Sequence, residues 1–279
     1  MISRLLRNPA AALGLVILSA ILLLAVAGPV FAPPEAFTID LEGSLRGPSP
    51  GHPFGQDKLG RDIFWQVICG ARTSVVVALA VVASTVVVGS FFGALAGYFG
   101  GAVDVIIMRV VDILLSFPGI LLAIALAGIL GPSLWNIVVV LSFLGWVGYA
   151  RLVRAQFLTL RERDYVQAAR AVGAGPGRII MRHIFPNALS PVIVQATFSA
   201  AAVILAESSL AFLGLGPQDV PSWGRLIAHG VDYLQFGPHI AFYPGIFIMV
   251  TVLALNLVGD SLRDVLDPKT APGRAAGRS

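Results

Sequence analysis

The chain alternates between long apolar runs and short polar segments. A helix needs roughly 20 apolar residues to cross a hydrocarbon core of about 30 Å. We expect six such spans, at about residues 10–31, 73–99, 105–130, 134–151, 190–214 and 240–259. Only 12% of the 279 residues are charged, about half the share that is typical of a soluble domain. The pattern therefore predicts an all-α integral membrane protein with six transmembrane helices.

The basic residues predict how these spans are oriented. With the N-terminus in the cytoplasm, 14 of the 19 lysines and arginines fall on the cytoplasmic side, seven of them between residues 151 and 182. The outer side receives only Arg46, Lys58, Arg61, Arg72 and Arg225. Because cytoplasmic loops carry the excess of basic residues, we expect both termini to be cytoplasmic.

The first apolar run has an alternative interpretation as a cleaved signal peptide. Arg4 and Arg7 precede it, and Ala25-Val26-Ala27 resembles a cleavage site. However, the apolar run from Pro9 to Ala27 is longer than the usual core of about 7–15 residues in such signals. A retained membrane anchor is therefore expected.

Composition and motifs exclude several kinds of site. The net charge of +4 comes from arginines beside apolar spans and does not indicate nucleic acid. Cys69 is the only cysteine, and neither lysine follows a glycine, so the phosphate-binding loop GxxxxGK[ST] is absent. The four histidines show no ligand spacing, and HExxH and GxSxG are also absent. We expect no catalytic residue, no cofactor-binding residue and no metal site in this chain.

The outer segment 32–72 combines prolines and glycines with two aspartates. Asp57 and Asp62 could belong to a metal site, but the further oxygen ligands of a calcium loop are missing, so roles in a turn and a helix cap are favoured. Ile63, Phe64 and the residues after them predict a short helix lying at the membrane interface.

The arginine-rich segment 152–188 predicts two short helices. Tyr165, Ala168, Ala169 and Val172 recur at helical spacing and form one apolar stripe. Asp164 is expected to cap this helix, Gly173 and Gly175 to end it, and Pro176 to begin the next. Ile179, Ile180 and Ile184 form a second stripe, which Pro186 and Asn187 are expected to break before the fifth span. Two such helices joined by glycines would form a docking surface for a soluble partner. The alternative is a helix pair lying on lipid headgroups.

The same segment resembles the cytoplasmic signature of ABC importer permeases. It reads Gln167-Ala168-Ala169-x3-Gly173-x9-His183-x-Phe185-Pro186, against the family pattern Glu-Ala-Ala-x3-Gly-x9-Ile-x-Leu-Pro. The spacing and the Ala-Ala, Gly and Pro positions match, whereas Gln167, His183 and Phe185 depart from it. Further blocks resemble the dipeptide/oligopeptide/nickel subfamily, of the second-permease type: HPFGQDKLGRDIF (52–64), GARTSV (70–75), ESSLAFLGLGPQ (207–218), PSWG (221–224) and NLVGDSLRDVLDP (256–268).

The resemblance implies the type I ABC importer transmembrane domain fold and a set of partners. These are a second homologous permease subunit, two ABC ATPase subunits, an extracytoplasmic substrate-binding protein and the lipids of the inner membrane. The substrates would be peptides or similar small solutes, and ATP hydrolysis would occur on the partner subunits. The segment would be the coupling loop, with the ATPase contacted by Arg163, Tyr165, Gln167, Ala168, Ala169, Arg170, Gly173, Arg178, Arg182 and Pro186.

Two further features lie within the spans. Glu207 is a carboxylate in the fifth span, where it is either a structural hydrogen-bonding group or a pathway residue. Gly89, Gly93 and Gly97 repeat every four residues, a spacing that favours close helix packing. The stripe could face either the chain's own bundle or the partner permease.

These predictions divide the chain into three parts. Residues 1–69 hold the first span and the outer segment, residues 70–262 form the permease core with the coupling loop 152–188, and residues 263–279 form a cytoplasmic tail. The rival hypothesis is a stand-alone secondary transporter or channel, which requires ionisable residues along a midplane path. Glu207 is nearly alone in that respect, so the importer subunit is favoured.

Overall fold

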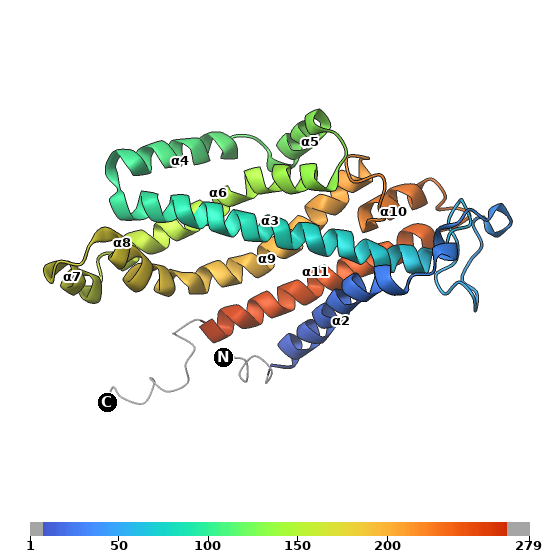
Figure 1. Cartoon of the computed structure of the whole chain (residues 1–279), viewed down its shortest axis with the longest axis horizontal. Coiled ribbons are helices and arrows are strands. Elements are labelled where there is room, and N and C mark those ends of the chain that lie inside the picture. The colour runs from blue at the N-terminus through green and yellow to red at the C-terminus, as the bar shows by residue number, and fades with distance from the viewer. Residues whose placement is uncertain (1–7, 267–279) are drawn as a thin grey trace.

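A computed structural model describes residues 8–266 as a bundle of long helices. Five helices are long and apolar enough to span a membrane: α2 (Pro9–Phe31), α3 (Ile63–Phe99), α6 (Leu134–Leu160), α9 (Phe185–Phe212) with the turns before it, and α11 (His239–Leu266). Figure 1 shows them extending along the long axis of the molecule, with the segment between α2 and α3 at one end and α7 (Asp164–Ala171) at the other.

The ends of the first and last helices meet at one end of the bundle. Asn8 Nδ2 at the start of α2 donates to Ser261 Oγ near the end of α11 at 3.2 Å. The Ser190 hydroxyl, near the start of α9, donates to the Leu266 carbonyl at 3.5 Å. The chain thus enters and leaves the bundle on the side where α9 begins, as an even number of spans requires. Basic positions 4, 7, 269, 274 and 278 and most of the predicted tail 263–279 lie outside the described residues.

The third predicted span is broken. The run 105–130 forms α4 (Gly101–Leu115) and α5 (Gly119–Leu130), which are bent by 85° relative to each other. Pro118 has no N–H to continue the helical ladder, and it disfavours helical geometry at Phe117. The expectation of one continuous helix here is therefore wrong, although the bent pair still counts as a possible sixth span.

The predicted short helix after Asp62 is also wrong, because Ile63 begins the 37-residue helix α3. The Asp62 side chain caps its start by accepting hydrogen bonds from the backbone N–H groups of Phe64 and Trp65, as expected. No proline interrupts residues 63–72, so nothing separates an interfacial helix from the second span. At about 1.5 Å per residue, α3 is about 55 Å long and extends beyond the hydrocarbon core.

The glycine stripe packs within the chain's own bundle. A Cβ added at Gly89 would lie 2.5 Å from the Trp146 carbonyl oxygen, and one at Gly93 would lie 2.5 Å from that of Ala150. A Cβ at Gly97 would lie 2.6 Å from the Phe157 Cβ. All three neighbours belong to α6, so the stripe serves the close α3–α6 contact.

Short elements close the two ends of the bundle. The outer segment contains the 3-10 turns η1 (Pro34–Phe37) and η2 (Leu41–Gly43), and α10 (Trp223–Val231) lies between α9 and α11. At the opposite end, α7 is followed by α8 (Pro176–Arg178) and the π-helical turn η3 (Ile179–Ile184), which leads directly into α9.

Candidate functional site

The α7–η3 segment is anchored on the end of the bundle by an apolar cluster. Val166 of α7 and Ile184 of η3 are fully buried, and both pack in one cluster with Phe157 of α6 and Ala188 of α9. Burial of side chains of this size stabilises the attachment by about 1.5–3 kcal/mol each. The short helices are therefore held in a defined place on the bundle.

The buried side of α7 differs from the apolar stripe in the sequence. Of the four stripe residues only Ala169 is buried, whereas Tyr165 is 43% exposed, Val172 is 85% exposed and Ala168 is also exposed. Val166, which lies outside the stripe, fills the cluster instead. The helix thus has apolar residues on two sides, and its own chain covers only one of them.

Gly173 ends α7 as expected. Its φ of +80° is left-handed, its N–H donates to the Arg170 carbonyl at 2.9 Å, and the N–H of Ala174 donates to the Ala169 carbonyl at 3.0 Å. This pair of bonds is the Schellman arrangement, in which a glycine supplies the left-handed residue. Pro176 then begins α8, also as expected.

Two predicted roles in this segment are wrong. Asp164 does not cap α7; Arg163 occupies the capping position without a side-chain bond, and Asp164 lies in the first helical turn. Pro186 and Asn187 do not break the chain before the fifth span, because residues Pro176–Phe212 run as one continuous helical segment. The π-helical turn accommodates the proline, since its wider spacing lets Phe185 N–H bond to the Ile180 carbonyl just before Pro186.

The arginines of the segment divide into anchors and exposed groups. Arg161 donates to the Gly97 carbonyl of α3 at 3.1 Å, and the Arg170 guanidinium lies 5.7 Å from the Tyr98 ring centroid. The side chains of Arg163, Arg178 and Arg182 are exposed and form no ion pair or hydrogen bond with the rest of residues 8–266. Three exposed cations of the segment thus remain available to a partner.

Gln167 lies next to an acid. Its amide nitrogen is 3.5 Å from Glu162 Oε2 and 3.4 Å from the Arg161 carbonyl oxygen, and both are long hydrogen bonds. A glutamate at 167 would place a second negative charge beside Glu162. The glutamine therefore keeps the contact without like-charge repulsion.

Arg154 and Asp104 form an ion pair that the sequence did not indicate. Arg154 Nε and Nη2 lie 2.5 Å and 2.7 Å from the two Asp104 oxygens, joining α6 to α4. The residues are 50 positions apart, so no local spacing could have revealed the pair. Val166 was also missed, because a single valine beside a longer stripe carries no distinct periodic signal.

Glu207 is buried near the other end of α9. Its Oε2 accepts hydrogen bonds from Ser74 of α3 at 3.0 Å and from Ser208 at 3.4 Å, while Oε1 has no hydrogen-bond partner among the described residues. Gly224 of α10 packs against the backbone of Ser208, and Trp223 donates to the Val67 carbonyl at 2.9 Å. Glu207 therefore lies where α3, α9 and α10 join. Residues 8–266 contain no group of three or more acidic, histidine or cysteine side chains that could hold a metal ion.

Known proteins with this sequence pattern are membrane transport subunits. Residues 89–272 match the family model of the binding-protein-dependent transport system inner membrane component, and residues 1–48 match that of the N-terminal TM domain of oligopeptide transport permease C. The dipeptide transport system permease protein DppC of Alkalihalophilus pseudofirmus is 42% identical over 94% of this chain and 87% of its own length. The oligopeptide transport system permease protein OppC of Bacillus subtilis is 38% identical over 94% of this chain and 86% of its own length.

The fold agrees with a solved transporter. A chain of the inward-facing MetNI methionine ABC transporter superimposes with a TM-score of 0.58 at 18% identity, over 74% of this chain and 98% of that one. This likeness shows the type I importer fold, and the relatives confirm the family that the coupling-loop pattern indicated. The chain therefore belongs to the inner-membrane permease subunits of binding-protein-dependent ABC importers.

Proposed function

We propose that the chain forms one half of a translocation pathway for peptides or similar small solutes. The other half would be a second homologous permease, and two ABC ATPase subunits would supply the energy. An extracytoplasmic binding protein would deliver the substrate. The peptide assignment rests on relatives of 38–42% identity that are named as dipeptide and oligopeptide permeases.

The exposed apolar face of α7 carries this proposal. Tyr165, Ala168 and Val172 point away from the chain's own core on a helix that Val166 and Ala169 hold in place. An anchored helix with an uncovered apolar face fits a protein partner, and the small Ala168 side chain permits close approach of that partner. The exposed Arg163, Arg178 and Arg182 of the same segment would offer cations to an acidic surface of that partner.

Continuous helical structure offers a route for coupling. A displacement of α7 would act through the Gly173 turn on the segment Pro176–Phe212, which runs unbroken to the buried Glu207. At about 1.5 Å per residue these 37 residues extend about 55 Å. A shift at the inner end would therefore reach the α3–α9–α10 junction, where Ser74 holds Glu207. We assign Glu207 a structural role at that junction.

The test enlarges one side chain at the proposed contact. Ala168→Trp should abolish uptake by the complex reconstituted with its partner permease, ATPases and binding protein, because the indole prevents close approach. Ala168→Ser, which keeps the small size, should retain uptake. Copurification of the ATPases and binding-protein-stimulated ATP hydrolysis would separate lost docking from lost coupling.

Two results would contradict the proposal. Normal uptake by an assembled Ala168→Trp complex would show that this face does not contact the ATPase, and would instead favour the lipid-headgroup interpretation. Uptake by vesicles containing this chain alone would support the rival hypothesis of a stand-alone transporter.

A further inference from the structure

A polar pocket opens at the outer end of the bundle, far from α7. It has a volume of about 190 Å³ and lies between the start of α3 and the segment that connects α9 with α10. Its charged and polar lining consists of Arg61, Gln66, Gln218, Asp219, Ser222, Arg225 and His229. The proposed transport cycle assigns no role to it.

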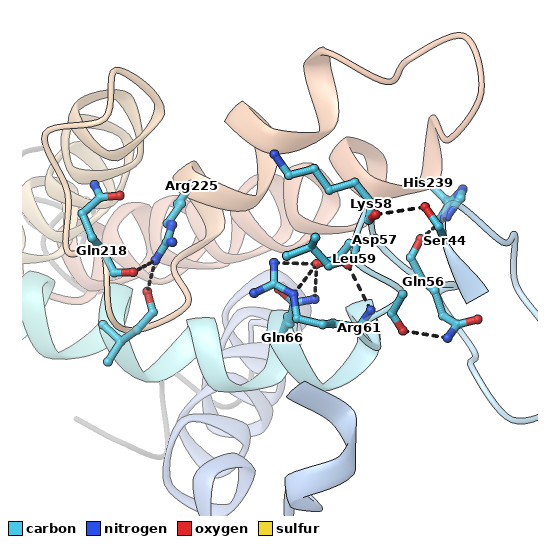
Figure 2. A network of polar contacts seen from close by, with 12 residues as sticks. Ser44, Gln56, Asp57, Lys58, Leu59, Arg61, Gln66, Gln218, Arg225 and His239 are labelled. Atoms are coloured by element: carbon cyan, nitrogen blue, oxygen red, sulfur yellow. Dashed lines mark hydrogen bonds and ion pairs between the residues drawn. The ribbon is translucent and has the colours of Figure 1, made fainter. Parts of the chain in front are cut away.

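Arg61 is already paired in this pocket. Its Nε and Nη2 lie 2.8 Å and 2.7 Å from Asp57 Oδ2, and Gln66 Nε2 donates to the same oxygen at 3.0 Å. The other Asp57 oxygen accepts the backbone N–H groups of Leu59 and Arg61. Figure 2 shows these side chains converging on Asp57. Asp57 therefore has no capacity left for a second arginine.

Arg225 has no acidic partner among residues 8–266. One of its terminal nitrogens donates to the backbone carbonyls of Gln218 and Val220, as Figure 2 shows. Its Nε is buried and has no hydrogen-bond partner in the described part of the chain. The nearby Asp219 lies too far away for an ion pair with it in the described structure.

The surroundings of Arg225 are electropositive. Burial, and then the charge of Arg61, lower the pKa of its guanidinium from the ordinary value. Lys58 also lies close enough to affect His229 of the same pocket. The pocket lining thus contains two permanent cations, Arg61 and Arg225, and one acid, Asp219, while Asp57 beside it is saturated. A partly buried guanidinium with an unused donor is costly until an anion accepts from it.

We infer that this outer pocket binds a carboxylate between Arg225 and Arg61. A guanidinium presents donors in a fork that matches the two oxygens of a carboxylate. The carboxylate would belong either to an acidic side chain of the extracytoplasmic binding protein or to the C-terminus of an incoming peptide. The choice of these two sources rests on the proposed function, because an importer receives both a binding protein and a peptide substrate at its outer face.

The test uses the whole complex in lipid nanodiscs and two readouts. The first is the affinity of the purified binding protein for the complex, and the second is saturation-transfer NMR with tri-alanine and with tri-alanine amide. Arg225→Gln and Asp219→Asn are the variants, and the exposed outer Arg46→Gln is the matched control. Arg225→Lys keeps the charge and reports on folding.

The two variants should act in opposite directions. In the wild type, tri-alanine should give a saturation-transfer signal and tri-alanine amide should not. Arg225→Gln should abolish the tri-alanine signal, whereas Asp219→Asn should increase it. If the binding protein supplies the carboxylate, its docking should also weaken at least about tenfold in Arg225→Gln, since a charged hydrogen bond is lost. Unchanged docking together with loss of the tri-alanine signal would assign the pocket to the peptide.

One combination of results would overturn the inference. The wild type would give no carboxylate-dependent signal, and the binding protein would bind the wild-type, Arg225→Gln and Arg46→Gln complexes with equal affinity. Uptake by the wild type and its loss in Ala168→Trp do not involve Arg225. Such a failure would therefore leave the proposed function standing.

Discussion

The two ends of the molecule satisfy their polar and apolar groups in different ways. At the outer end, Gln56, Asp57, Asp62 and Gln66 are all buried, and each has hydrogen-bond partners within the chain. At the inner end, α7 leaves Val172 85% exposed and has few polar contacts. The outer end is thus largely completed by its own chain, apart from Arg225, whereas the inner end still lacks a covering surface.

Two left-handed glycines make this difference measurable. Gly60 at the outer end has φ +74°, and an added Cβ would lie 1.7 Å from the Asp40 carbonyl oxygen. Gly173 at the inner end has φ +80°, and no atom lies within 4 Å of an added Cβ. The same backbone requirement is therefore combined with tight packing at one end and open space at the other.

The largest effect is expected from Gly60→Ala. The methyl group would overlap the Asp40 backbone, which cannot move without breaking the bond from Asp40 N–H to the Leu59 carbonyl. We expect a loss of more than about 4 kcal/mol of stability, or no folded protein. Thermal unfolding of the nanodisc complex measures it, with Gly47→Ala, which has open space, as the control. Equal melting of the two variants would contradict the tight outer end.

Asp57→Ala should have the next largest effect. It leaves the Arg61 guanidinium, the Gln66 amide and two backbone N–H groups without their acceptor. Because Arg61 keeps some access to water, we expect a loss of about 2–3 kcal/mol. The exposed Glu42→Ala is the matched control and should melt like the wild type. A similarly small decrease in melting temperature for both variants would show that the hydrogen bonds to Asp57 contribute little to stability.

Gly173→Ala should have a smaller effect on stability. Only the left-handed backbone opposes the methyl group, and this costs about 1–2 kcal/mol. Gly173→Asn should cost less, since asparagine tolerates this conformation better. Melting curves test this order: the melting temperature should be lowest for Gly173→Ala, higher for Gly173→Asn and highest for the wild type. If Gly173→Ala destabilised as much as Gly60→Ala, the inner end would be packed as tightly as the outer one.

The smallest effect is a pH dependence at the outer end. Burial, and then the charges of Arg225, Lys58 and Arg61, lower the pKa of His229, against a weaker opposing effect of Asp57. The unfolded chain therefore binds this proton more readily, so this part of the stability is present above about pH 6.5 and is lost as the pH falls below it. Melting temperatures measured from pH 7.5 to 5.5 should fall less steeply in His229→Gln. An unchanged slope would exclude His229 as a contributor.

Much of the fold was predictable because it depends on local properties. Three predicted features each depend on a short stretch of sequence: the length of the spans, the arginine-rich loop and the end of α7 at Gly173. Asp62 as a cap and Asp57 in a turn were likewise predictable, since each bonds backbone groups within four residues. The break before Pro118 also has a local cause, but the apolarity of the run concealed it.

The sequence predicted the short helices of the candidate site but not which of their side chains face inward. The signature predicts an ATPase contact within residues 163–186, and the resemblance indicated the family that the relatives confirm. It did not show that Val166 faces inward while Tyr165 and Val172 face outward. A helix of eight residues with apolar groups on two sides has no intrinsic inward face, so the shape of the surface beneath it decides.

The sequence by itself determined that the chain is a helical membrane protein with long apolar spans and that short helices lie within residues 164–184, because apolarity and helical spacing are local properties. The tertiary structure alone decided that Gly89, Gly93 and Gly97 pack on α6, that Arg154 pairs with Asp104 and that Pro186 lies within a continuous helix. It also decided that Arg225 has no acidic partner within residues 8–266. These outcomes depend on which side chains meet across distances of tens to hundreds of residues, and pairing at such distances is set by packing rather than by local preference.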